Sequence, residues 1–191
     1  LQSNVVEVDL LFHDFLIGVT SFFRDPGAYE VLSDMAIPLL FANKPAGHTI
    51  RVWVPACSTG EEAYTLAILL YEFIEKQSLD FRIQIFATDI DHTAIERARA
   101  GSYEINIVAD ISPERLTRFF VLSQDKHSYQ IRKSIREMIV FSEQNIIKDP
   151  PFSRMDMISC RNLMIYLNAE IQKKLIPMFH YSLNEAGLLF L

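Results

Sequence analysis

The sequence predicts an α/β fold in which a doubly wound, mostly parallel sheet is covered by helices on both faces. Short apolar runs rich in β-branched residues alternate with longer runs of helical spacing, the pattern of a parallel sheet with crossover helices. Polar loops containing glycine, proline or asparagine separate these runs. The chain has 191 residues, half of them hydrophobic, which suits one domain with a large core.

Each element follows from a local signal. Apolar residues at helical spacing predict the helices, and short β-rich apolar runs predict the strands. Gly101 can cap one helix, and Pro113 suits the first turn of the next. In chain order we expect a helix over 28–42, a strand over 50–56, a helix over 61–77, a strand over 83–88, a helix over 91–100, a helix over 112–120, a strand over 138–141, a strand over 155–160, a helix over 169–183 and a strand over 187–191.

Residues 121–137 differ from the rest of the chain. Polar and apolar side chains alternate from Ser128 to Arg132, which is typical of a half-buried strand. We therefore predict a small antiparallel ribbon inserted between the helix over 112–120 and the strand over 138–141.

Charge is distributed unevenly along the chain. The net charge is -6, with 5 basic and 14 acidic residues in 1–96 and 13 basic and 10 acidic residues in 97–191. A protein that binds nucleic acid would usually be basic, so we expect no nucleic acid partner. An anionic protein partner should meet the second half. The basic residues of the ribbon and its preceding helix are Arg115, Arg118, Lys126, Arg132, Lys133 and Arg136.

The two cysteines, Cys57 and Cys160, each end an apolar strand, and no CxxC pair or Cys/His cluster is present. We expect two buried thiols and no metal site, in a reducing, cytoplasmic compartment. No apolar run reaches the roughly 18 residues that a membrane helix needs. The chain begins without Met and stops inside an apolar run, so we expect a piece of a longer protein.

The loop after the first strand favours a particular kind of ligand. It contains only one glycine, Gly60, and Glu61 and Glu62 occupy the helical turn that follows. These carboxylates would repel a pyrophosphate, and the GxGxxG pattern of a dinucleotide site is absent. A nucleotide ligand with a cationic end and no phosphate, such as S-adenosylmethionine, fits better. The alternative is that both glutamates only complement the helix dipole.

Asp89 directly follows the second core strand, at the edge of the sheet where ligands bind. An acid at this position can accept hydrogen bonds from both ribose hydroxyls. The alternative role is a helix N-cap, which Asp91 can fill instead.

Four segments resemble the successive motifs of the CheR chemotaxis receptor methyltransferases. They are TSFFR at 20–24, ACSTGEE at 56–62, ATDID at 87–91 and CRNLMIY at 160–166. The likeness runs from about residue 10 to the end and is strongest to the CheR module of CheB/CheR fusion proteins. Such proteins join a methylesterase, a methyltransferase and sensor domains. The resemblance implies a class I S-adenosylmethionine-dependent methyltransferase with a Rossmann-like fold.

The resemblance also implies a domain organisation. Residues 1–45 would be the remnant of an N-terminal helical domain with its linker, and 46–191 the methyltransferase domain, with the ribbon at about 121–137. The sheet would be truncated, because the family adds two more strands. Gly18 stands where stand-alone enzymes often have Asn. The ribbon loop 123–128 lacks glycine, so we expect docking without the receptor-tail pentapeptide that some members bind.

The activity that the resemblance implies is methylation of glutamate side chains on a chemoreceptor or related signalling protein. Arg24 and Tyr166 would lie nearest the transferred methyl group as the catalytic pair. Glu62 would bind the amino group of the cofactor, and Asp89 its ribose. The other implied cofactor contacts are Thr20, Arg24, Ala56, Ser58, Asn145, Ile146, Arg161 and Asn162.

Two alternatives remain open. One is a catalytically weak or inactive module that senses the cofactor or docks a partner. The other is a nucleic acid amino-methyltransferase, because DPPF at 149–152 resembles a motif of those enzymes. In those enzymes the motif follows the fourth strand, whereas here it precedes the strand over 155–160. Binding of S-adenosylhomocysteine followed by methyl transfer to a receptor fragment would discriminate among these possibilities.

Overall fold

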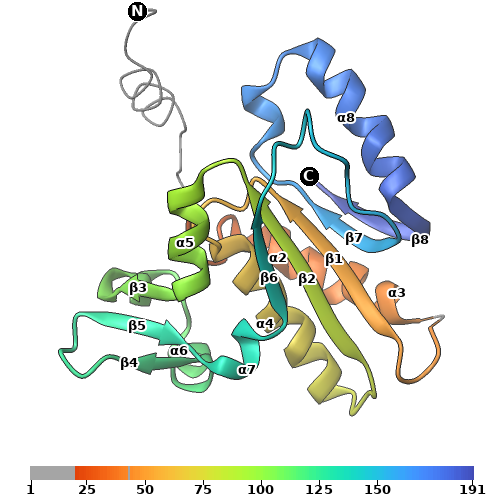
Figure 1. The fold of residues 1–191 in the computed structure, drawn as a ribbon. Coiled ribbons are helices and arrows are strands. Elements are labelled where there is room, and N and C mark those ends of the chain that lie inside the picture. Colours follow the sequence, from red (N-terminus) through yellow and green to blue (C-terminus); the bar gives the residue numbers. More distant parts are fainter. Residues whose placement is uncertain (1–19, 43) are drawn as a thin grey trace, which may run out of the picture.

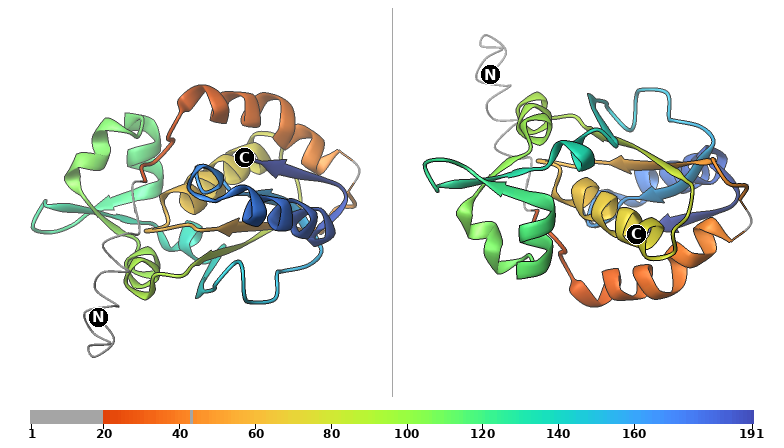
Figure 2. Two further views of the ribbon diagram at one scale, coloured as in Figure 1. Left: turned by 90° about the horizontal axis from the view of Figure 1, so that it is seen from above. Right: turned by 90° about the horizontal axis from the view of Figure 1, so that it is seen from below.

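The computed structural model describes residues 20–42 and 44–191 (Figure 1). At its centre lies a five-stranded parallel sheet in the order β6-β2-β1-β7-β8. Helix α4 and the segment from α2 to α3 cover one face, and α8 covers the other (Figure 2). The direction of winding reverses between β1 and β7, which is where sheets of this type bind ligands. The predicted doubly wound α/β fold is confirmed.

The described elements follow the predicted order with small shifts at their ends. In chain order they are α2 (Pro26–Val31), η1 (Leu32–Ala36), α3 (Ile37–Phe41), β1 (Thr49–Pro55), α4 (Glu61–Lys76), β2 (Arg82–Asp89), α5 (His92–Ala100), β3 (Ser102–Glu104), η2 (Ile105–Ala109), α6 (Pro113–Phe119), β4 (Phe120–Leu122), β5 (Ser128–Ile131), α7 (Lys133–Arg136), β6 (Ile139–Glu143), β7 (Met155–Ser159), η3 (Met164–Tyr166), α8 (Ala169–Ser182) and β8 (Leu183–Phe190).

The predicted helix over 28–42 is present as one helical segment with a π turn in its middle. Elements α2, η1 and α3 are continuous, and the Ile37 N–H donates to the Leu32 carbonyl, five residues back. Pro38 accounts for the wider turn, because it has no N–H to continue the α-helical pattern. The buried face of this segment, including Tyr29, belongs to the same core as β1 and α4.

The predicted ribbon over 121–137 is a three-stranded antiparallel sheet in the order β3-β5-β4, which we call the small sheet. The prediction missed β3, which adds an outer strand directly after α5. It also extended the ribbon too far, because residues 133–136 form the short helix α7. The side chain of Ile135 is buried in the core, and a helical turn places it there.

Four of the six basic residues expected to meet a partner make contacts within the chain. Lys133 pairs with Glu137, Arg132 donates to the Thr117 carbonyl, and the other two are Arg115 and Arg118. Arg115 donates to both oxygens of Glu72, with N–O distances of 2.9 and 2.8 Å, and Arg118 pairs with Glu75. These pairs attach α6 to α4 and neutralise part of the positive charge. Steering of an acidic partner by this surface stays a prediction.

The boundaries of the C-terminal helix and strand differ from the prediction. The helix expected over 169–183 ends at Ser182, and β8 begins at Leu183 instead of residue 187. Strands β7 and β8 pair in parallel, but the register shifts between Met155 and Met157. The extra residues of β8 form an irregular stretch in which Ala186 has a φ of 59°.

A smaller core cluster lies around Trp53, on the face that α8 covers. Phe152 packs there, with its ring centroid 5.6 Å from Trp53 and 4.8 Å from Phe86. The last residue of the DPPF segment is therefore part of a core cluster and precedes β7. This position weakens the nucleic acid amino-methyltransferase alternative. Cys57 and Cys160 are both buried, as predicted. No helix within 20–42 or 44–191 has the length and apolar character needed to cross a bilayer.

Candidate functional site

The loop between β1 and α4 is a compact turn at the carboxyl edge of the sheet. Ala56, Ser58 and Gly60 adopt left-handed backbone conformations, with φ angles of 56°, 48° and 95°. A Cβ atom on Gly60 would lie 2.9 Å from the Cβ of Ala98, so only glycine lets α4 begin this close to α5. The backbone of this turn lies at the position where the sequence predicts that a ligand binds.

Asp89 ends β2 beside this turn and holds it in place. Its Oδ2 accepts the N–H of Ser58 at 2.7 Å, and its Oδ1 accepts the N–H of Asp91 at 3.0 Å. Asp91 is the N-cap of α5, accepting from Thr93 and Ala94, so that role does not fall to Asp89. Burial raises the pKa of Asp89, and the backbone hydrogen bonds oppose this rise. Each carboxylate oxygen retains further acceptor capacity, which suits hydroxyl ligands such as those of a ribose.

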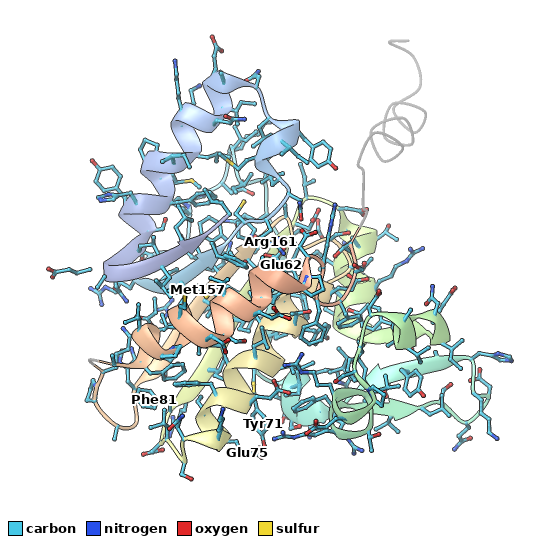
Figure 3. The ribbon with its side chains drawn as sticks, turned by 180° about the vertical axis from the view of Figure 1, so that it is seen from behind. Glu62, Tyr71, Glu75, Phe81, Met157 and Arg161 are labelled. Carbon is cyan, nitrogen blue, oxygen red and sulfur yellow. The ribbon has the colours of Figure 1, made fainter. Side chains whose placement is uncertain are left out.

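Glu62 lies partly buried in the first turn of α4, facing the end of β7. The Ser159 hydroxyl donates to its Oε1 at 2.5 Å. Burial raises the pKa of Glu62, whereas the Ser159 hydroxyl, the charge and backbone of Arg161, and the charge of Arg24 lower it. Glu62 and Arg161 lie close together in Figure 3. Three segments that are far apart in sequence therefore converge on one carboxylate.

Glu61 has a different environment from its neighbour. The Thr59 hydroxyl donates to its carboxylate, with O–O distances of 2.9 and 2.7 Å, and burial raises its pKa. It lines a cavity of about 500 Å³ between the small sheet and the segment that begins at Thr20. A role in complementing the helix dipole does not explain why both glutamates are withdrawn from water.

Arg161 follows β7 and binds the segment that carries Arg24. Its Nη1 donates to the Arg24 carbonyl at 2.7 Å, and its Nη2 donates to the Asp25 carboxylate at 2.9 Å. The guanidinium carbon lies 5.1 Å from the ring centre of Tyr29 and 5.0 Å from that of Phe190. The side chain of Arg161 is thus engaged by the protein, and its contact with a cofactor stays a prediction.

Asn145 and Ile146 begin the loop after β6. The Asn145 side-chain oxygen accepts the N–H groups of Ile147 and Lys148 and so shapes the loop itself. The Ile146 side chain packs against the Trp53 cluster. The structure places this loop at the carboxyl end of β6, and its contact with an adenine stays a prediction.

The remaining predicted residues lie around the same edge of the central sheet, and fewer contacts define their roles. Asn162 has a φ of 60°, directly after Arg161. Tyr166 lies in η3 with 53% of its surface exposed, so its ring is not part of the core. Thr20 lines the cavity next to Glu61. Gly18 lies outside the described residues.

Sequence reasoning missed three residues of this site, namely Asp25, Tyr29 and Ser159. Asp25 and Tyr29 bind Arg161, and Ser159 binds Glu62. A signal was available only for Ser159, a hydroxyl residue at the end of an apolar strand and directly before the CRN motif. The other two contacts depend on tertiary structure.

Several known proteins are similar to this chain. It is 43% identical over its full length to an "Uncharacterized 104.1 kDa protein in hypE 3'region" of Rhodobacter capsulatus, of which it covers 20%. Over 90% of its length it is 34% identical to "Chemotaxis protein methyltransferase 1" of Pseudomonas aeruginosa, covering 64% of that protein. Over its full length it is 32% identical to "Putative methyltransferase Cher3" of Pseudomonas putida, covering 71%. The chain therefore spans only part of each relative.

Solved structures of other methyltransferases share the fold. The DszA carbon methyltransferase superposes with a TM-score of 0.53 at 15% identity, over 86% of this chain and 35% of that one. The glycopeptide N-methyltransferase MtfA, in complex with sinefungin, gives a TM-score of 0.50 at 12% identity, over 96% and 60%. At such low identity these likenesses show the fold alone.

The sequence model described as "CheR methyltransferase, SAM binding domain" matches residues 18–191. This match includes all four motifs and both carboxylates at the edge of the sheet, Glu62 and Asp89. The chain therefore belongs to the CheR methyltransferase family and contains that family's S-adenosylmethionine-binding domain.

Proposed function

We propose that this chain methylates glutamate side chains on a chemoreceptor or related signalling protein, with S-adenosylmethionine as methyl donor. The observation that carries the proposal is the pair of carboxylates, Glu62 and Asp89, at the switch point of a CheR-family sheet. Burial raises the pKa of each carboxyl, so each would be stabilised by a ligand that supplies a cation or hydroxyl donors. A phosphate group would be repelled there.

The chemistry requires orientation more than acid–base assistance. Bound S-adenosylmethionine supplies an electrophilic methyl group. An acceptor glutamate, with an ordinary pKa of about 4.3, is already ionised at neutral pH and needs no general base. Orienting the reactants is worth about 7–11 kcal/mol in favourable cases. Arg24 would bind and neutralise the acceptor carboxylate, Tyr166 would fix its rotation, and Glu62 and Asp89 would bind the amine and ribose of the donor.

We also propose that this unit belongs to a cytoplasmic, multidomain signalling protein. The full-length match to a fifth of a 104.1 kDa relative supports a larger parent, and the two buried free thiols suit a reducing compartment. The boundary near residue 45 belongs to this proposal, although residues 26–41 already pack into the core of the sheet. The small sheet would dock the receptor.

The proposal is tested with S-adenosylhomocysteine calorimetry and with transfer of a labelled methyl group to a helical receptor fragment. We expect binding, followed by label on glutamate residues that mass spectrometry can map. A fragment with each labelled glutamate changed to glutamine is the matched control and should remain unlabelled. Binding without transfer to any glutamate would instead favour the cofactor-sensing alternative.

The catalytic pair is tested by Tyr166→Phe, which removes only a hydroxyl from a half-exposed ring. Turnover should fall about 10- to 100-fold, the effect of losing about 1.4–2.7 kcal/mol of transition-state stabilisation. S-Adenosylhomocysteine affinity should not change. Arg24→Ala should lower turnover further, because the acceptor charge loses its partner. Wild-type turnover in both variants would show that neither residue acts in the transfer.

A further inference from the structure

We propose that Arg161 is a positioning residue, which holds a strained turn at residues 23–25 so that Arg24 is presented to the methyl-transfer site. This inference rests on the proposed function, because that function assigns Arg24 to the acceptor carboxylate. It gives the guanidinium of Arg161 a role in shaping the protein.

The backbone on both sides of Arg24 is in the left-handed region. Phe23 has a φ of 51° and Asp25 a φ of 59°, and neither is glycine. This conformation costs a residue with a Cβ atom roughly 1–2 kcal/mol, and a bulky aromatic residue rarely adopts it. Such strain persists only where the surroundings impose it, and it is concentrated at functional sites.

Phe23, the residue before Arg24 in the turn, is held by helix α4 and by Arg115. The Phe23 N–H donates to the Thr65 hydroxyl of α4 at 3.2 Å, and Phe23 as a whole is 8% exposed. The guanidinium of Arg115 lies 4.5 Å from the centre of the Phe23 ring. These contacts account for the conformation of Phe23. The backbone at Arg24 and Asp25 is held by contacts from another part of the chain.

Arg161 holds those residues from the end of β7. Its two terminal nitrogens donate to adjacent residues of the turn, one to the Arg24 carbonyl and one to the Asp25 carboxylate. The rings of Tyr29 and Phe190 flank the guanidinium, and its side chain is 9% exposed. Its Nε atom is buried without a hydrogen-bond partner in the described part of the chain. A lysine has one terminal nitrogen and cannot reproduce this geometry, in which two separate nitrogens of a planar group each bind a different residue.

The position of Arg161 links both halves of the proposed reaction. Its charge and backbone act on Glu62, on the donor side, while its side chain fixes the backbone of Arg24, on the acceptor side. Arg161 lies two residues after the end of β7, a fully buried strand, so its backbone is anchored to the core of the protein. The geometry therefore sets the acceptor group relative to the donor group.

The first test measures amide hydrogen exchange in Arg161→Lys without cofactor or acceptor. We expect exchange at residues 23–29 to accelerate about tenfold, as one lost hydrogen bond would allow, while amides of α4 keep their rates. Arg118→Lys is the matched control, because it makes the same change at an arginine paired with α4. Unchanged exchange at 23–29 would overturn the inference, whatever the activity of the protein.

The second test compares turnover with cofactor binding. Arg161→Lys should lower turnover about tenfold and should lower S-adenosylhomocysteine affinity by a smaller factor, because the positive charge beside Glu62 is kept. If Arg161 acts through Arg24, Arg24→Ala combined with Arg161→Lys should be no slower than Arg24→Ala alone. Independent, multiplying effects would contradict this role.

A milder variant covers the case in which Arg161→Lys does not fold. Asp25→Ala removes one of the two contacts from a residue that is 59% exposed, so the fold should persist. Exchange at 23–29 should still accelerate, whereas Asp34→Ala, an exposed acid in η1, should leave it unchanged. Equal exchange in both variants would overturn the inference. Absence of methyl transfer by the wild-type chain would refute the proposed function, and the exchange result would still decide the role of Arg161.

Discussion

Buried or partly buried carboxylates lie at both ends of the central sheet. The two ends differ in whether hydrogen bonds outweigh the effect of burial on the pKa. At the beginning of β7, Asp156 is 1% exposed and accepts from Lys44 Nζ at 2.5 Å, the Arg51 N–H at 2.9 Å and the Asn184 amide at 2.8 Å. Burial raises its pKa, but these hydrogen bonds outweigh burial and leave the pKa below its ordinary value.

At the carboxyl ends of the strands the balance is reversed. Burial raises the pKa of Glu62 and of Asp89, and the hydrogen bonds each one receives do not compensate. A carboxylate whose partners all come from the protein is a structural feature. One left with a raised pKa in a ligand-binding edge is available to bind something else. Under the proposed function, this difference separates a residue that stabilises the fold from two that bind the cofactor.

The largest expected effect that tests this comparison is on folding. Asp156→Ala leaves Lys44 and the Arg51 N–H without their shared acceptor, and should lower the free energy of unfolding by about 3–5 kcal/mol. Because the native pKa of Asp156 is lowered, its stabilisation is present above the ordinary value of about 3.9 and is lost as pH falls through the native value. Urea denaturation across that range is the measurement. A loss below about 1 kcal/mol would remove the contrast.

Glu62→Gln should affect binding and folding in opposite directions. S-Adenosylhomocysteine affinity should fall about 10- to 100-fold, because a charged hydrogen bond to an amine is worth about 1.5–3 kcal/mol. A raised native pKa means that the contribution of Glu62 to stability is greatest below about pH 4.3 and is lost as pH rises through the native value. The variant should therefore be more stable than wild type at neutral pH. Calorimetry and urea denaturation at pH 7 and pH 4 would show both effects, and destabilisation at pH 7 would place Glu62 with Asp156.

Asp89→Ala should weaken S-adenosylhomocysteine binding by about 1–3 kcal/mol through loss of hydrogen bonds to the ribose. Part of this loss would be indirect, because the Ser58 N–H also loses its acceptor. Adenosine, which retains the ribose but lacks the α-amino group of the homocysteine end, separates the two acids in calorimetry. Its binding should weaken in Asp89→Ala and stay unchanged in Glu62→Gln. An unaltered affinity for both ligands in Asp89→Ala would remove Asp89 from the site.

Ser159→Ala should have the smallest effect and would sharpen the comparison most. The Ser159 hydroxyl lowers the pKa of Glu62, so its removal should raise that pKa further. In the proposed site the amino group of the ligand binds the ionised Glu62 carboxylate, so affinity should increase with pH. The variant should shift this increase to higher pH. At neutral pH the loss of binding free energy should be about 0.5–1.5 kcal/mol, the net contribution of a typical single hydrogen bond. Affinity profiles that superpose from pH 4 to 8 would show that Ser159 does not tune Glu62.

The sequence predicted most of the sheet and only the local part of the site. Strands and helices were recognisable because their periodicities are local. Glu62 was recognisable because it lies in the first turn of a helix, and Asp89 because it ends an apolar strand. The predictions missed β3 and the π turn at η1, which have too few residues for a period to register. The contacts of Glu62 with Ser159 and of Arg161 with Asp25 join residues 97 and 136 positions apart. No local pattern reports contacts at that separation.

Helix α4 mechanically connects the edge of the central sheet with α6. Its first turn carries Glu62, and its later turns carry Glu72 and Glu75, to which α6 is attached by Arg115 and Arg118. With a rise of about 1.5 Å per residue, some 15–20 Å of stiff helix separates the two ends. A load applied to α6 therefore acts on the same stiff helix that carries the carboxylate at the edge of the sheet.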